Sequence, residues 1–119
     1  MTLSCYAMLL FLNSCSSAEP KKEKVNYNEM ILSCSQNGNL ECVKTCIENG
    51  ADSNSKNQYG NTALMWASSE GFTKIAELLL KSGADPNAVD IYGKTSLYFA
   101  KLKKYKDIEK LLRENGAKY

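Results

Sequence analysis

The feature that most constrains this chain is a sequence motif that returns at a fixed interval. Gly50–Asp52 reads Gly-Ala-Asp and returns as Gly83–Asp85, and Tyr59–Leu64 returns in similar form as Tyr92–Leu97. A fixed period of about 33 residues predicts stacked copies of one small unit rather than a single irregular core. Such stacks present an extended surface to another macromolecule, so the repeat already bears on function.

The clearest copy of the unit predicts two short helices. Apolar residues recur at helical spacing over 62–69 and again over 73–81. Gly71 lies between the two segments and suits a tight turn, because glycine readily adopts a positive φ at a helix end. Thr62 and the equivalent Thr95 are predicted to cap their helices through the hydroxyl oxygen. Each unit therefore predicts a helix, a turn, a second helix and a turn-rich excursion.

These units resemble ankyrin repeats, whose pattern runs Gly-x-Thr-Pro-Leu-His-x-Ala, a glycine turn, an Ile/Leu-rich helix and Gly-Ala-Asp-x-Asn. Residues 55–87 match this pattern almost throughout, 88–119 match it less fully, and 28–54 form a diverged copy without the Gly-x-Thr turn. The resemblance implies an all-α solenoid of about three helix-turn-helix units, with the first and last units acting as caps. The matches of the second copy are Gly60, Thr62, Leu64, Ala67, Gly71, Ile75, Leu79, Leu80, Gly83, Ala84, Asp85 and Asn87.

Two positions depart from the family pattern in both of the better copies. The proline is replaced by Ala63 and Ser96, and the histidine is replaced by Met65 and Tyr98. Without proline, the start of the first helix is less preorganised. The hydrogen bonds that the imidazole makes between neighbouring turns in the family are also lost. We therefore expect a domain of modest stability.

Length and composition favour one binding domain over an enzyme. The 119 residues leave room for one domain. The 15 basic and 13 acidic residues nearly balance, and the resulting formal net charge of +2 does not predict a nucleic-acid partner. The chain has no histidine, the commonest general acid/base and metal ligand. No nucleophile elbow or phosphate-binding loop occurs either. We expect no catalytic site, no metal and no cofactor.

Residues 1–27 differ in composition from the rest of the chain. Residues 1–14 carry no charged side chain and contain a short apolar run, which predicts a signal peptide. Leu12–Cys15 resembles the lipobox of bacterial lipoproteins, in which the cysteine, here Cys15, is lipidated after cleavage. Cleavage after Ser16–Ala18 would instead give plain secretion, and a retained hydrophobic helix is the third alternative. Residues 15–27 are expected to be a flexible tether.

Three cysteines fall in the first repeat. Cys34, Cys42 and Cys46 occupy positions that hold Ala67, Ile75 and Leu79 in the next copy, so packing in the core is the favoured interpretation. A metal site would need more ligands than these. An exported domain could still oxidise Cys34 with a cysteine of the following helix.

The strongest charge feature is a basic cluster near the C-terminus. A nucleic-acid or lipid-headgroup contact is conceivable, but a polar outer face of a capping unit is the favoured interpretation. The cluster comprises Lys101, Lys103, Lys104, Lys106, Lys110 and Arg113.

Aromatic residues repeat in register on the predicted binding side. Trp66 and Phe99 are one repeat period apart, and so are Tyr59 and Tyr92 just before the turn glycine. In ankyrin repeats these turn tips and inner helix faces contact the partner, and aromatic residues dominate interface energetics. The equally weighted alternative is that Trp66 and Phe99 pack on each other. The predicted partner-binding residues are Tyr59, Asn61, Trp66, Glu70, Tyr92, Lys94 and Phe99.

The functional prediction is a non-enzymatic protein–protein interaction module displayed in the bacterial cell envelope. It is expected to be monomeric and anchored in the membrane through lipid at Cys15. Two alternatives remain open, namely an intracellular ankyrin adaptor with an unprocessed N-terminus and a periplasmic inhibitor or accessory subunit of an enzyme.

Overall fold

Three helix pairs follow one another along the chain in the computed structural model, which describes residues 25–118. No strand occurs in this range, so the predicted all-α solenoid is confirmed. The first helix begins at Tyr27, inside the range expected to be a tether. The helices are α2 (Tyr27–Asn37), α3 (Leu40–Glu48), α4 (Ala63–Glu70), α5 (Thr73–Lys81), α6 (Ser96–Leu102) and α7 (Lys106–Glu114).

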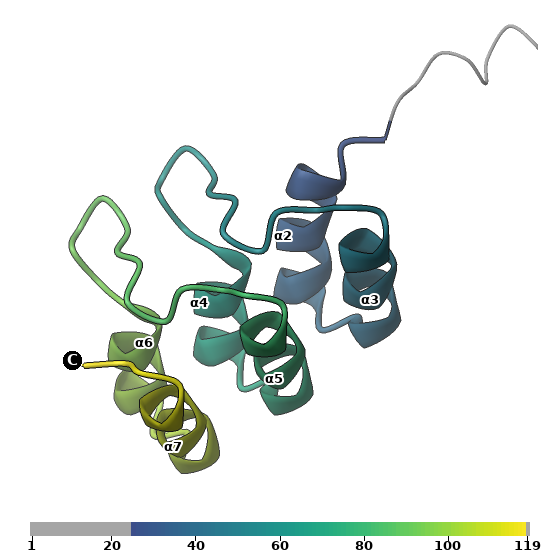
Figure 1. The fold of residues 1–119 in the computed structure, drawn as a ribbon. Coiled ribbons are helices and arrows are strands. Elements are labelled where there is room, and N and C mark those ends of the chain that lie inside the picture. The colour runs from purple at the N-terminus through teal and green to yellow at the C-terminus, as the bar shows by residue number, and fades with distance from the viewer. Residues whose placement is uncertain (1–24, 119) are drawn as a thin grey trace, which may run out of the picture.

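The pairs stack side by side in two rows (Figure 1). The first helices of the pairs, α2, α4 and α6, form an inner row, and α3, α5 and α7 form an outer row. Contacts run within each pair and between neighbouring pairs along both rows. Two long loops, 51–62 and 84–95, project from the inner side as fingers (Figure 1). Each finger leads from one pair into the next, so finger positions follow directly from the stacking.

Side-chain caps start the helices of the inner row. The Thr62 hydroxyl accepts a hydrogen bond from the Met65 N–H, and the Thr95 hydroxyl accepts one from the Tyr98 N–H, each at 3.2 Å. Both predicted caps are confirmed. Asn26 caps α2 through its side-chain oxygen, which accepts from two backbone N–H groups. Each such bond satisfies a donor that the first turn of a helix leaves unpaired.

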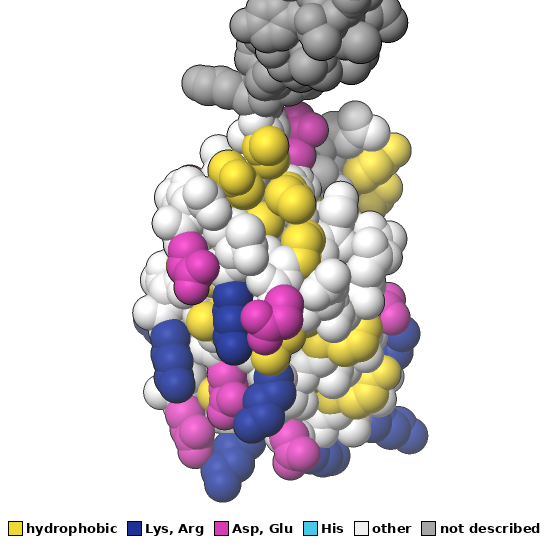
Figure 2. Space-filling model, turned by 90° about the vertical axis from the view of Figure 1, so that its right-hand side faces the viewer, with side chains coloured by type: hydrophobic (Ala, Val, Ile, Leu, Met, Phe, Trp, Pro, Cys, Tyr) yellow, Lys and Arg dark blue, Asp and Glu magenta, His cyan; other side chains and the backbone are white. Residues whose placement is uncertain are grey.

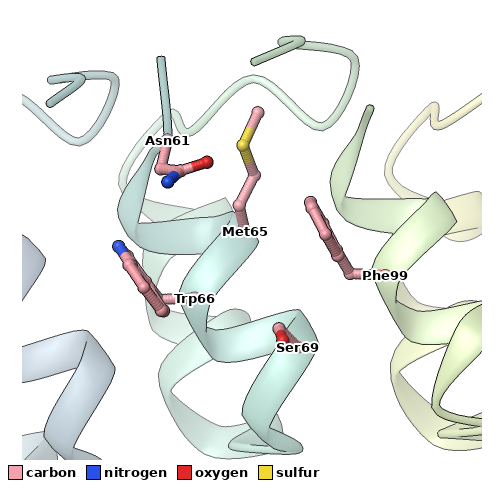
Figure 3. A pocket seen from close by; sticks show the side chains of 5 residues that line it. All are labelled: Asn61, Met65, Trp66, Ser69 and Phe99. Atoms are coloured by element: carbon pink, nitrogen blue, oxygen red, sulfur yellow. The ribbon is translucent and has the colours of Figure 1, made fainter. Parts of the chain in front are cut away.

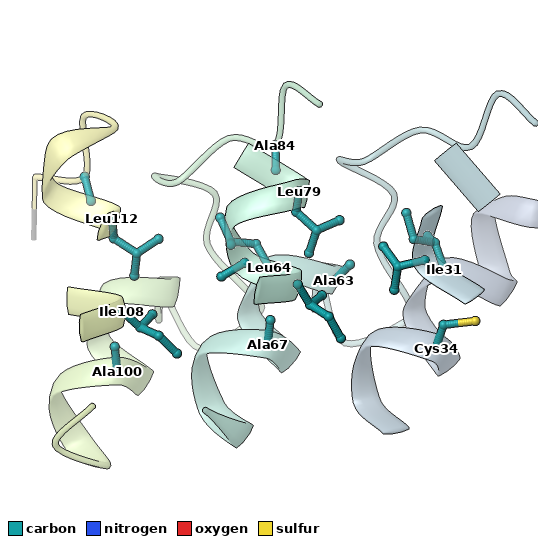
Figure 4. Packing of buried hydrophobic residues seen from close by; sticks show 14 of the residues in the cluster. Ile31, Cys34, Ala63, Leu64, Ala67, Leu79, Ala84, Ala100, Ile108 and Leu112 are labelled. Atoms are coloured by element: carbon teal, nitrogen blue, oxygen red, sulfur yellow. The ribbon is translucent and has the colours of Figure 1, made fainter. Parts of the chain in front are cut away.

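The core repeats with the sequence. Ile31, Leu64 and Leu97, one from each inner helix, are fully buried, and the outer helices supply an equally regular set (Figure 4). Apolar side chains are buried both within each pair and between neighbouring pairs, so stacking adds hydrophobic stabilisation that a single pair lacks. The outer helices contribute Ile75, Leu79, Ile108 and Leu112 to this core.

An asparagine links each repeat to the end of the next. The Asn54 amide donates to the Gly83 carbonyl oxygen at 3.1 Å and accepts from the Asp85 N–H at 2.6 Å. Asn87 bonds the following repeat in the same way, through Gly116 and Lys118. The asparagine that closes the Gly-Ala-Asp-x-Asn motif therefore bonds consecutive units to each other.

Replacing Asn54 by alanine should destabilise one joint between repeats. Two hydrogen bonds to exposed backbone groups are lost, and we expect the free energy of unfolding to fall by about 1 kcal/mol. Urea denaturation followed by circular dichroism measures the change. Asn37→Ala is the matched control, because Asn37 is exposed and bonds no neighbouring repeat. Equal losses in both variants would contradict the assigned role of Asn54.

Aromatic rings pack on the glycines that end two of the inner helices. Gly38 and Gly71 both have a positive φ, 76° and 81°. A Cβ at Gly38 would lie 2.7 Å from the ring of Phe72, and one at Gly71 would lie 2.9 Å from the ring of Tyr105. Glycine is needed at these two turns for conformation and for the close approach of the next repeat.

Gly71→Ala should cost more stability than Gly83→Ala. Both glycines have a positive φ, but nothing lies within 4 Å of a Cβ at Gly83. Gly83→Ala should therefore cost about 1–2 kcal/mol for the backbone alone. Gly71→Ala should add roughly 1 kcal/mol or more from overpacking against the Tyr105 ring.

A double-mutant cycle with Tyr105→Ala tests the source of this extra cost. The combined variant should lose less stability in urea denaturation than the sum of the two single changes. Additive losses would mean that the ring does not cause the extra cost.

The outer helices carry charges of both signs, as the space-filling view from that side shows (Figure 2). In the last repeat, Glu109 lies 3.7 Å from the Lys106 ammonium and 3.4 Å from the Arg113 guanidinium. This mixture is typical of a solvated outer face. Lys106, Lys110 and Arg113 of the C-terminal basic cluster belong to α7, whereas Lys101 belongs to the inner helix α6. None of the helices that the structure describes is both long and apolar enough to span a bilayer.

Candidate interaction surface

The two fingers have the same turn, built on one side chain each. The Asn57 side-chain oxygen accepts hydrogen bonds from the N–H groups of Tyr59 and Asn61 at 2.8 and 2.9 Å. Asp90 takes the same place in the second finger and accepts from Tyr92 and Lys94. Such side-chain bonds hold a short loop in one conformation. The fingers are therefore ordered by local bonds.

The fingers also contact each other. The Ile91 N–H donates to the Tyr59 carbonyl oxygen at 3.0 Å, and the Lys56 ammonium donates to the Val89 carbonyl oxygen at 3.2 Å. Close to these bonds, the tyrosine side chains extend into solvent, Tyr59 with an exposed fraction of 49% and Tyr92 with one of 72%. The hydrogen-bonded backbones of the two fingers therefore hold the exposed rings of Tyr59 and Tyr92 at the finger tips.

A shallow hollow lies between the inner helices of the second and third repeats. Its walls come from Trp66, Met65 and Ser69 on α4, Phe99 on α6 and Asn61 at the base of the finger. Figure 3 shows the Phe99 ring directed toward Met65, with the Trp66 ring on the far side of α4. The lining is mostly apolar, as expected where an aromatic or aliphatic side chain could be inserted.

A second, more polar hollow lies on the other side of Trp66. The first finger contributes Tyr59, and the facing wall belongs to α2. Trp66 is thus shared by both hollows, one on each side of α4. The residues of the α2 wall are Glu29, Leu32, Ser33 and Gln36.

The α2 wall was not among the predicted site residues. Leu32, Ser33 and Gln36 lie one repeat period before Met65, Trp66 and Ser69, so the period alone would have located them. The first copy lacks the Gly-x-Thr turn that marks the start of the other units, so the repeat period was the signal available for these positions.

The aromatic pair does not stack. Trp66 and Phe99 are both half-buried, and each ring lies between its own helix and the inner helix of the preceding repeat (Figure 3). The ring that contacts Phe99 edge-on is Tyr98, with centroids 5.4 Å apart. Both rings therefore contribute to the packing between repeats and leave part of their surface open to a ligand.

The predicted site residues fall into two groups. Asn61, Trp66 and Phe99 line one hollow, and Tyr59 joins Trp66 in the other. The remaining three lie outside both hollows, and whether any of the seven binds a partner stays a prediction. Glu70 is exposed at the end of α4, and Tyr92 is exposed at a finger tip. The Lys94 ammonium lies 4.3 Å from the Tyr98 ring centroid, a cation–π contact.

The cysteines of the first repeat lie together. The Sγ atoms of Cys34, Cys42 and Cys46 are all within 4.8 Å of one another, and Cys34 and Cys42 form a disulfide. Burial raises the pKa of the remaining Cys46 thiol, because desolvation disfavours the charged thiolate. A structural zinc site needs four ligands, so this oxidised group does not provide one. The predicted core location is confirmed for Cys34 and Cys46. It is wrong for Cys42, which is only partly buried and packs against the core. The oxidation of Cys34 with a cysteine of the following helix, the less favoured alternative, is present.

Comparison with known proteins agrees with this architecture. The family model described as ankyrin repeats in three copies matches residues 5–90 and 30–119. The chain belongs to the ankyrin-repeat family. An ankyrin repeat protein of Acanthamoeba polyphaga mimivirus is 46% identical over 43 residues, which cover 36% of this chain and 33% of the viral protein. The match therefore spans about a third of that relative's length. Ankyrin repeats generally serve as protein–protein interaction modules.

Proposed function

We propose that this ankyrin-repeat chain is a non-enzymatic module that binds a partner protein through its finger tips and inner helix face. One observation carries the proposal: Trp66 and Phe99 occupy equivalent positions in two repeats and line hollows between the inner helices while only half-buried. Large aromatic rings in such positions are the residues that contribute most to binding energy when a partner covers them.

The surface is preorganised, which lowers the entropic cost of binding. The fingers are held by Asn57 and Asp90, and the inner helices are held by the core beneath them. Little side-chain or loop freedom is then lost on association. Polar groups around the rings, such as Asn61, would favour partners that can hydrogen-bond beside an apolar anchor.

We also propose that the module is displayed in the bacterial cell envelope, anchored by lipid at Cys15. The support comes from the apolar run of residues 3–12 and the lipobox-like Leu12–Cys15. These residues lie outside the part of the chain that the structure describes. Anchoring through a tether would place the repeats at the membrane surface and leave the inner face free.

The binding surface can be tested by photo-crosslinking in cells. A photoreactive amino acid replaces Tyr59 or Tyr92 at the finger tips, or Lys74 on the outer helix α5 as the control. Defined crosslinked species should form from the finger positions and not from position 74. Adding Trp66→Ala with Phe99→Ala should remove these species, a loss of tenfold or more in yield if each ring contributes about 1 kcal/mol or more.

The matched control for the aromatic variant changes the outer face. Lys74→Ala with Glu77→Ala removes an exposed ion pair, 3.8 Å long, on α5. It should leave crosslinking unchanged, and both variants should keep the helical circular dichroism signal. Undiminished crosslinking in the folded aromatic variant would refute binding at the inner face.

The lipid anchor has its own test. Wild-type protein expressed in a bacterium should incorporate labelled fatty acid, fractionate with membranes and have an intact mass that lacks residues 1–14. Cys15→Ala should abolish the labelling. An unprocessed chain in the cytosolic fraction would instead support the intracellular adaptor.

A further inference from the structure

The first repeat contains a cross-link that the other two repeats lack. Cys34 on α2 and Cys42 on α3 form a disulfide with Cα atoms 5.7 Å apart, within the usual range for disulfides. At the equivalent positions the second repeat has Ala67 and Ile75, and the third has Ala100 and Ile108. The fold therefore does not need cysteine there, and the first repeat differs from its neighbours in being bonded across its two helices.

The cross-link lies in the repeat whose sequence departs most from the family pattern. Among the described residues, the first helix pair contacts another pair on one side only (Figure 1). It also lacks the Gly-x-Thr turn that opens the other two units. A repeat with one described neighbour gains interface stability from that side alone, because each interface adds stability to both of its repeats. A bond between α2 and α3 therefore adds stability to a repeat that has a single described interface.

The same helix provides one wall of the binding surface. Leu32, Ser33 and Gln36 on α2 face Trp66 across the second hollow, and Cys34 directly follows two of them in the helix. Cys34 points into the core, whereas Ser33 and Gln36 are exposed. Any loosening of α2 on α3 changes the wall opposite Trp66.

We propose that Cys34 and Cys42 are a reversible redox modification site that controls the order of the first repeat and, with it, the α2 wall opposite Trp66. The consequence for partner binding rests on the function proposed above, whereas the effect on α2 does not.

The oxidation is a thiol–disulfide exchange with a low-molecular-weight disulfide such as oxidised glutathione. The half-buried Cys42, as thiolate, attacks one sulfur of that disulfide and releases a first small thiolate. Cys34, as thiolate, then attacks the Cys42 sulfur of the mixed disulfide and expels a second small thiolate. The two protons lost by the cysteines are taken up by the two released thiolates. Two equivalents of the small thiol reverse the reaction.

Cys46 stays outside this exchange. The structure bonds Cys34 to Cys42 and leaves Cys46 as a free thiol, the most deeply buried of the three cysteines. Burial also raises the pKa of the Cys46 thiol, which further disfavours its thiolate. Cys34 and Cys42 are eight residues apart. Closing a loop of this length shifts the opening equilibrium of the repeat by a factor on the order of 50 to 100 in the chain-entropy model.

The test compares the full chain after equilibration with oxidised or reduced glutathione. Trypsin cleaves after Lys24 and Lys44, so one peptide carries both Cys34 and Cys42, and the next carries Cys46. After alkylation without reduction, the first peptide from oxidised protein should carry no alkyl group and should be two hydrogens lighter than the same peptide with two free thiols. The peptide from reduced protein should carry two alkyl groups. The Cys46 peptide should be alkylated in both samples.

Two readouts then follow the first repeat without any partner. Reduction should increase the hydrogen exchange of α2 and α3 amides on the order of 50- to 100-fold, with a much smaller change in α6 and α7. Trp66 is the chain's only tryptophan, so acrylamide quenching of its fluorescence reports on the wall that α2 forms. Quenching should increase on reduction.

The repeat alignment supplies the control variants. Cys34→Ala with Cys42→Ile copies the second and third repeats, so it should fold and show no response of either readout to glutathione. Cys46→Leu copies Leu79 and Leu112 and should respond like the wild type.

Three results would each overturn the proposal: a doubly alkylated peptide from the oxidised sample, equal hydrogen exchange of α2 and α3 in both samples, or a redox response in Cys34→Ala with Cys42→Ile. Loss of the finger-tip crosslinks is scored on other variants, so failure of the proposed binding function would be recognised separately.

Discussion

Burial between neighbouring helix pairs is the interaction on which the rest of this structure depends. A single pair of short helices cannot enclose its own apolar side chains, so Ile31, Leu64 and Leu97 are buried only because the pairs stack. Fingers, hollows and caps all take their positions from that stacking. The described chain has two such joints, and each is completed by an asparagine that bonds the end of the following repeat.

The candidate surface lies at the joints between neighbouring helix pairs. Trp66 and Phe99 fill the space between inner helices and also line the two hollows, so they contribute to packing and keep part of their surface open to a partner. Met65 shows the difference that a covering repeat makes, since its exposed fraction is 2%, whereas that of the equivalent Tyr98 is 38%. In the third repeat this position is open, and the Tyr98 ring is contacted by Lys94 instead.

The helices, their ends and the core could be predicted from the sequence because they depend on local patterns. Thr62, Thr95 and Gly71 act within one turn of their own position, and the repeat period transfers every assignment from one copy to the next. Contacts that cross repeats were harder to predict. The bond between Asn54 and Gly83 joins residues of two different units.

Two features of the site show why the sequence left it incomplete. The end of the first repeat is bonded by Asn28, which aligns with Asn61 rather than with Asn54, so the period points to the wrong residue. The direction of the aromatic rings also depends on neighbouring side chains. The sequence could place Trp66 and Phe99 on the inner helices, but it could not decide between stacking and separate gaps.

Lys104 has a consequence for how such an array could grow. It occupies the position of Gly38 and Gly71 and adopts a φ of 63°, and no ring from a following repeat packs on it in the described structure. A repeat stacked on α6 and α7 with a tyrosine at the position equivalent to Tyr105 would bring that ring against the Cβ of Lys104. Stacking an aromatic-bearing repeat on this one would therefore require glycine in place of Lys104, so the residue at this single turn decides which kind of neighbour the unit accepts.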